Sequence, residues 1–111
     1  MFGVTQDIVI QPYDSNSVNP MVLAGASFDS VLIAPNPNTG VFNLYVSMYK
    51  AQHLLMTVTS LAGQMVFVQE WDGQQIVSQQ IVLPSSVVSG AYIVELVTDS
   101  DVRDYNIIVA K

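Results

Sequence analysis

Apolar residues recur at every second position through most of this chain. In the segment "VFNLYVS", Phe42, Leu44 and Val46 fall on one face, and Asn43 and Tyr45 fall on the other. A helix would need a period near 3.6, whereas a period of two is typical of a strand with one buried face. The segments are also rich in Val, Ile, Thr and Tyr, which pack well on a pleated surface. The sequence therefore predicts strands rather than helices.

About seven short segments have this character, with turn signals between them. The sharpest signal is Asp72-Gly73, because Asp-Gly readily supplies the positive φ angles of a type I′ hairpin. Other turns are expected at Ala62-Gly63, Pro84 to Gly90 and Asp99 to Asp101. Short strands at this spacing, with no helix between them, indicate an all-β antiparallel sandwich or barrel. The predicted strands are Val31–Ala34, Val41–Ser47, Leu54–Leu61, Gln64–Trp71, Gln74–Leu83, Ala91–Thr98 and Tyr105–Ala110.

Charge excludes several classes of partner. Nine acids face only Lys50, Arg103 and Lys111, which gives a formal charge of −6. Nucleic-acid surfaces and polybasic membrane patches need the opposite sign, so we expect neither. No apolar run approaches the roughly 18 residues of a membrane-spanning helix, so direct membrane insertion is not expected. Because only 11% of the residues are charged, the surface must use Ser, Thr, Asn and Gln. In "QQIVSQQIV" we expect glutamine to fill the solvent face.

The first 27 residues differ from the rest. Residues 1–27 contain small, polar stretches such as "DSNSVNP" and "LAGAS", and we predict that they form a linker or the end of a preceding region. The segment is compatible with a short strand through Ile8 and Ile10 and with another at Met21–Leu23. A single β-sandwich domain is predicted for residues 28–111. No basic segment followed by an apolar run opens the fragment, so we expect any export signal to lie upstream.

No constellation for catalysis, a metal or a cofactor emerges from the residues. His53 is the single histidine and precedes an apolar strand, which favours a rim position over a general base. The segment "DSDVRD", Asp99–Asp104, lacks the glycine of a calcium loop and includes an arginine, which favours a hairpin tip. Trp71 with Tyr45 and Tyr49 is a candidate carbohydrate platform, although a tryptophan before Asp-Gly is more often a core edge. The chain is therefore not expected to be an enzyme.

Four segments, in order, resemble the C-terminal sorting domains of the type IX secretion system of Bacteroidetes-type bacteria. "APNPNTGVFNLYV", Ala34–Val46, is similar to the first motif of that family. "VTSLAGQMV", Val58–Val66, is similar to the middle motif, and "LPSSVVSGAYIVELVTDS", Leu83–Ser100, to the third. "YNIIVAK", Tyr105–Lys111, is similar to the terminal motif. The positions that carry the resemblance are Pro35, Asn36, Pro37, Gly40, Gly63, Gln64, Gly90, Tyr92, Ile107, Ile108, Val109 and Lys111.

The resemblance implies a fold and a function. Members of the family form an immunoglobulin-like antiparallel sandwich that takes a cargo protein through the outer-membrane translocon. The implied partners are the type IX translocon and its shuttle components. A sortase-like cell-surface peptidase then typically removes the domain, and the cargo is anchored to the cell surface or released. Here the cut would fall in the linker before residue 28, within residues 11–27. The family commonly has a basic residue just before the terminal strand, whereas this chain has Arg103 slightly earlier, followed by Asp104.

The terminal strand, Tyr105–Ala110, is predicted to lie at or near a sheet edge, where an exposed strand can add another strand. We expect the translocon to recognise the surface formed by Gly90–Val97 and Tyr105–Lys111, partly through backbone pairing. The alternative is that these segments are core strands and that recognition lies elsewhere. Two copies could also pair there as an edge-strand dimer. The alternative function is a carbohydrate-binding or adhesive β-sandwich module of a secreted protein, in which Trp71 would contact the glycan.

Overall fold

The fold is known from a computed structural model, which describes residues 26–111. The predictions for Ile8, Ile10 and Met21–Leu23, and those for most of the linker, lie outside the described residues. Within residues 26–111 the structure is all-β, as predicted, and contains no helix that could span a membrane. Its strands are β1 (Phe28–Ala34), β2 (Val41–Ser60), β3 (Met65–Val82), β4 (Gly90–Val97) and β5 (Val102–Val109).

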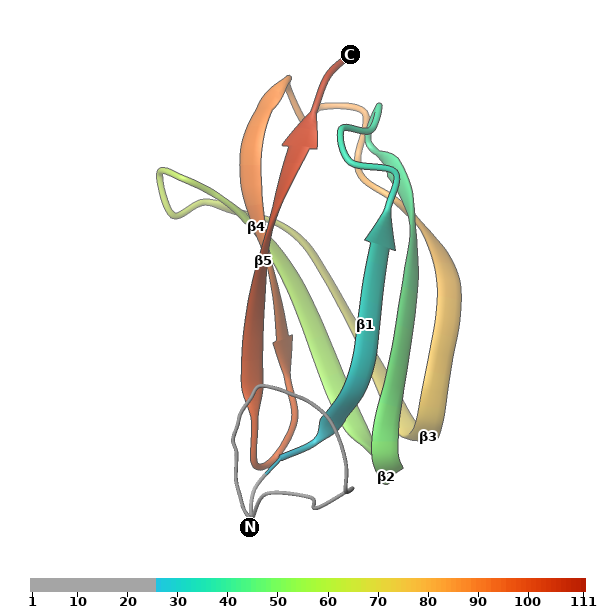
Figure 1. Cartoon of the computed structure of the whole chain (residues 1–111). Helices are drawn as coiled ribbons and strands as arrows, with labels where there is room; N and C mark the ends of the chain where they lie inside the picture. Colours follow the sequence, from blue (N-terminus) through green and yellow to red (C-terminus); the bar gives the residue numbers. More distant parts are fainter. Residues whose placement is uncertain (1–25) are drawn as a thin grey trace, which may run out of the picture.

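The long strand β2 changes one of its partners halfway along its length, whereas β3 pairs with β2 throughout. The first half of β2, Val41–Ser47, pairs with β1 on one side and with the second half of β3 on the other. The second half of β2, Leu54–Ser60, pairs with the first half of β3 and with β4. β5 then pairs with β4, so all strands belong to one antiparallel sheet that curls around its core (Figure 1).

The predicted Asp72-Gly73 hairpin is wrong. Trp71 and Gln74 would face each other across a hairpin, but Trp71 pairs with Leu54 and Gln74 pairs with Gln52, both on β2. The register shifts at this level, and Gly73, with a φ of 69°, lies at a bend within a continuous strand. A positive φ serves a bulge as well as a hairpin turn, so Asp-Gly alone does not distinguish the two. The seven-stranded immunoglobulin-like sandwich is therefore not confirmed, and five strands are found among the described residues.

The predicted buried faces are confirmed. Phe42, Leu44 and Val46 are fully buried, whereas Asn43 and Tyr45 on alternate positions are exposed. Full burial stabilises the fold by about 1.5–3 kcal/mol for a large apolar side chain. The curl of the sheet thus encloses one apolar core. Its other members are Phe28, Met48, Leu54, Met56, Val58, Trp71, Val77, Ile81, Leu83, Val87, Tyr92, Val94, Leu96, Ile107 and Val109.

One glutamine of "QQIVSQQIV" faces inward, contrary to the prediction. Gln79 lies between the buried residues Val77 and Ile81 and exchanges two amide hydrogen bonds with Gln69, at 3.3 and 3.1 Å. The indole Nε1 of Trp71 also donates to Gln79 Oε1, at 3.0 Å. A polar side chain directed toward a core needs such partners. The group links the two halves of β3 across the curl.

Candidate functional site

The last strand lies at an edge of the sheet, as predicted. β5 pairs with β4 from Val102 opposite Val97 to Val109 opposite Gly90, and β4 separates β5 from the rest of the sheet. In Figure 1, β5 and β1 lie at the front and run in the same direction, and their C-terminal ends reach the same end of the molecule. This arrangement brings the segment after β1 to the free edge of β5.

The "PNPN" segment covers part of that free edge. The side chain of Asn36 accepts from Ile108 N through Oδ1, at 2.8 Å, and donates from Nδ2 to Asn106 O, at 3.1 Å. The backbone of Asn38 continues the contact, because its N donates to Ile108 O at 2.9 Å and its O accepts from Ala110 N at 2.7 Å. The carboxamide of Asn36 therefore substitutes for a peptide group, and Asn38 forms a parallel bridge to Val109.

The conformation of this segment is held by its own asparagine and glycine. Asn38 is only 4% exposed, and its side chain accepts from Gly40 N at 2.8 Å and donates to Pro35 O at 3.3 Å. An asparagine side chain that bonds the backbone two residues on forms an Asx-turn. Gly40 has a φ of 98°, which other residues adopt at a cost, and β2 begins at the next residue.

Residues of the third motif complete the same end of the molecule. Gly40 O accepts from Leu83 N at 2.8 Å. The N–H of Lys111 donates to Ser89 Oγ at 2.9 Å, and its ammonium donates to Ser85 O at 3.1 Å. The hydroxyl of Tyr92 donates to Val88 O at 2.7 Å, which closes the loop before β4. We call this set the C-terminal junction; it comprises Pro35–Gly40, Leu83–Tyr92 and Asn106–Lys111.

The middle motif is not part of the C-terminal junction. Gly63 and Gln64 lie in the turn between β2 and β3, which projects sideways from the body in Figure 1. Ser60 N donates to Gln64 O at 2.8 Å, and Gln64 N donates to Ser60 Oγ at 3.1 Å. Both contacts are within the turn. The glycine and glutamine of the middle motif therefore lie outside the C-terminal junction, although Val58–Ser60 of that motif pair with Tyr92–Val94 on β4.

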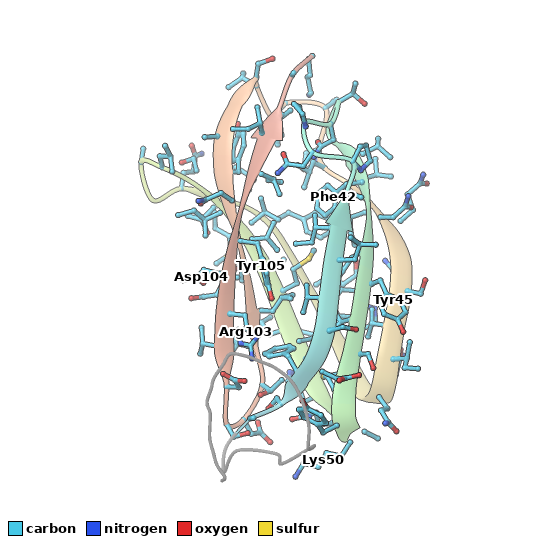
Figure 2. The ribbon with its side chains drawn as sticks, in the orientation of Figure 1. Phe42, Tyr45, Lys50, Arg103, Asp104 and Tyr105 are labelled. Atoms are coloured by element: carbon cyan, nitrogen blue, oxygen red, sulfur yellow. The ribbon has the colours of Figure 1, made fainter. Side chains whose placement is uncertain are left out.

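Neighbouring residues of the terminal motif face opposite sides of the sheet. Ile107 and Val109 are 1% exposed and belong to the core, whereas Ile108 is 43% exposed on the outer face. On that face Ile108 lies opposite Ala91 on β4. Figure 2 shows the same alternation further back in β5, where Asp104 projects outward and Tyr105 lies toward the interior. The outer faces of β4 and β5 thus adjoin, with Ile108 on β5 beside Ala91 on β4.

The residues of the other candidate sites are arranged differently. Trp71 is 8% exposed and packs in the core, whereas Tyr45 projects from the outer face of β2 (Figure 2), so these two do not share an exposed platform. His53 Nε2 lies 3.1 Å from Glu70 Oε1 and its Nδ1 lies 3.8 Å from Asp72 Oδ1. Side chains in this group are at least 40% exposed, so it is a surface cluster beside the bend of β3. The cross-strand register that forms it could not be read from the sequence.

Acidic residues do not gather into a metal centre within residues 26–111, where no group of three or more His, Asp or Glu side chains is placed to hold an ion. In "DSDVRD" the carboxylate of Asp101 binds backbone N–H groups instead: Oδ2 accepts from Ser27 N at 3.1 Å, and Oδ1 accepts from Val102 N at 2.9 Å. Asp99–Asp101 form the turn between β4 and β5, as predicted, whereas Val102–Asp104 belong to β5.

Comparison with known families agrees with this geometry. A family model described as "Secretion system C-terminal sorting domain" matches residues 32–110, which include the whole C-terminal junction except Lys111. No curated protein matches the chain. Such domains are sorting signals rather than a known enzyme family, and the family implies export by the type IX machinery to the cell surface or beyond. The chain belongs to the C-terminal sorting domain family of the type IX secretion system.

Proposed function

We propose that residues 28–111 act as a folded sorting signal that directs a cargo protein through the type IX outer-membrane translocon. Residues 1–27 form the linker to the cargo. Family membership supports the sorting role. The observation that carries the proposal is the C-terminal junction, in which Asn36 and the terminal strand, 70 residues apart in the chain, are joined by hydrogen bonds. A signal made of distant segments exists only in the folded domain.

The recognition surface is the one formed by Gly90–Val97 and Tyr105–Lys111. Because Asn36 and Asn38 already bond the free edge of β5 from Asn106 to Ala110, a partner strand cannot pair there unless the loop moves. Backbone pairing is therefore assigned to the preceding part of the edge at Asp104–Tyr105, because the N–H of Val102 is already bonded to Asp101 Oδ1. Over the rest of the surface the translocon contacts side chains of the outer face, such as Ile108.

After translocation, a sortase-like cell-surface peptidase cuts the linker before residue 28, and the cargo is anchored to the cell surface or released. The route runs through the periplasm and the outer membrane. The resemblance of the four motifs to the family supports these steps.

The test is a reporter protein fused ahead of the full 111-residue chain, expressed in a bacterium with an intact type IX system. We expect the reporter to be secreted and a chain without Tyr105–Lys111 to be retained. A matched strain that lacks the translocon gives the background. Efficient secretion of the truncated chain would contradict the proposal.

A further inference from the structure

The first residues of the described domain are fixed at the end opposite the C-terminal junction. Ser27 is 2% exposed, and both of its backbone polar groups are used. Its N donates to Asp101 Oδ2 at 3.1 Å, and its O accepts from Tyr49 N at 3.0 Å. Ser27, the last residue of the predicted linker, is therefore packed against the domain, although it precedes the first strand.

The side chains strengthen this attachment. Ser27 Oγ shares hydrogen bonds with Thr98 Oγ1 at 2.6 Å and with Ser100 Oγ at 3.1 Å. The next residue, Phe28, is 3% exposed, and the guanidinium of Arg103 lies over its ring, 5.4 Å from the centroid. Such a cation–π contact helps to hold the Phe28 ring in place. We call this group the N-terminal lock; it comprises Ser27, Phe28, Thr98, Ser100, Asp101 and Arg103.

The N-terminal lock includes residues of the turn Thr98–Asp101, which is stabilised by its own hydrogen bonds. Thr98 N donates to Asp101 O at 2.9 Å, and Asp101 N donates to Thr98 Oγ1 at 3.1 Å. The backbone of Asp101 is thus held within its own turn, and its carboxylate accepts from Val102 N and Ser27 N. Contacts between Ser27 and this turn span 71 to 74 residues of sequence.

We infer that the N-terminal lock sets the inner limit of peptidase cleavage, so that the cut bond lies N-terminal to Ser27. This inference rests on the proposed function. A bond whose backbone groups are buried and hydrogen-bonded resists proteolysis until the segment opens. When opening is fast relative to cutting, the rate follows the population of the open form. Cutting at or beyond Ser27 would require release of Asp101, Tyr49 and the hydroxyl cluster together.

Limited proteolysis of the whole 111-residue chain tests the inference. Proteinase K and chymotrypsin are used, and intact mass gives the first residue of each fragment that retains Lys111. We expect the persistent fragments to begin no later than Ser27, and chymotryptic cutting after Phe28 to be slow. Asp101→Ala should raise the rate of cutting after Phe28 at least about tenfold, the change that follows from ~1.4 kcal/mol of lost local stability.

Asp99→Ala is the matched control, since Asp99 is exposed in the same turn. Thr98→Val, which replaces the hydroxyl with a methyl group of similar size, should also speed the cut. Both test variants must retain the far-UV circular dichroism of the parent; should Asp101→Ala unfold, Thr98→Val decides alone. Wild-type cutting after Phe28 as fast as upstream cutting would overturn the inference, as would equal rates for the folded test variants and Asp99→Ala.

The two proposals fail in different assays. Without secretion of the reporter, the proposed function fails while the proteolysis result stands. If the reporter is secreted but the C-terminus of its processed form lies at or beyond Ser27, the inference fails while the sorting function stands.

Discussion

The two ends of the molecule are held by different chemistry. At the C-terminal junction, backbone groups and the carboxamide of Asn36 extend the ladder of β5. At the N-terminal lock, hydroxyl groups and the carboxylate of Asp101 fix Ser27 with side chains. The family match starts at residue 32 and so covers the junction loop but neither Ser27 nor Phe28.

The difference separates two tasks in one small domain. The extended ladder holds the terminal strand in a defined register, so that the side chains on its outer face are available to a partner. The cluster of side chains around the buried Ser27 does not offer a strand to a partner. Its effect is to fix where the domain begins. In the proposed function these tasks are recognition by the translocon and separation from the cargo.

The largest expected difference in stability is between alanine variants of Ile107 and Ile108. Ile107→Ala removes a fully buried side chain at the C-terminal junction and should lower the free energy of unfolding by about 2–5 kcal/mol. Ile108→Ala, on the exposed face of the same strand, should lower it by less than about 1 kcal/mol. Urea unfolding of the two variants measures both. Equal losses would show that β5 does not pack as described.

Asn36→Ala should have the next largest effect. It removes two hydrogen bonds to β5 and should destabilise the domain by about 1–2 kcal/mol. Hydrogen exchange of the Ile108 amide should become faster, because that N–H loses its acceptor. The control is Asn43→Ala, whose side chain points to solvent from β2. Unchanged protection of Ile108 would mean that Asn36 does not hold the strand.

Two glycines with similar positive φ angles allow stability and secretion to be separated. Gly40 (φ 98°) lies in the C-terminal junction, and Gly63 (φ 90°) lies in the projecting turn. Alanine at either position should cost about 1–2 kcal/mol, because the left-handed region disfavours a Cβ. Thermal unfolding should show similar losses, but secretion of a fused reporter should fall only for Gly40→Ala, because Gly40 lies in the C-terminal junction and its O accepts from Leu83 N. Equal secretion defects would indicate that stability alone controls export.

Local sequence patterns correctly predicted the features that depend on residues close together in the chain. The alternation around Phe42 and Leu44 gave the correct buried face, and Gly40 marked the start of β2. Asp72-Gly73 misled because its positive φ suits both a hairpin and a bend, and the choice depends on pairing with β2. The inward position of Gln79 likewise follows from its contact with Gln69 across the curl.

The candidate site shows the same division. The sequence identified the segments of the C-terminal junction by resemblance and predicted that β5 lies at an edge. It could not predict that Asn36 would bond that edge, because the partners are about 70 residues apart and no local rule links them. The contact between Ser27 and Asp101 was missed for the same reason.

The central claim is that the sorting signal is recognised only when the "PNPN" loop holds the terminal strand in place. Its most direct test is the secreted fraction of a reporter fused ahead of the chain with Asn36→Ala, compared with Asn43→Ala, at matched cellular levels of folded protein. The account predicts that Asn43→Ala is secreted like the parent and that Asn36→Ala is largely retained. Secretion of Asn36→Ala at the parental level, with the Ile108 amide shown to exchange faster, would contradict it.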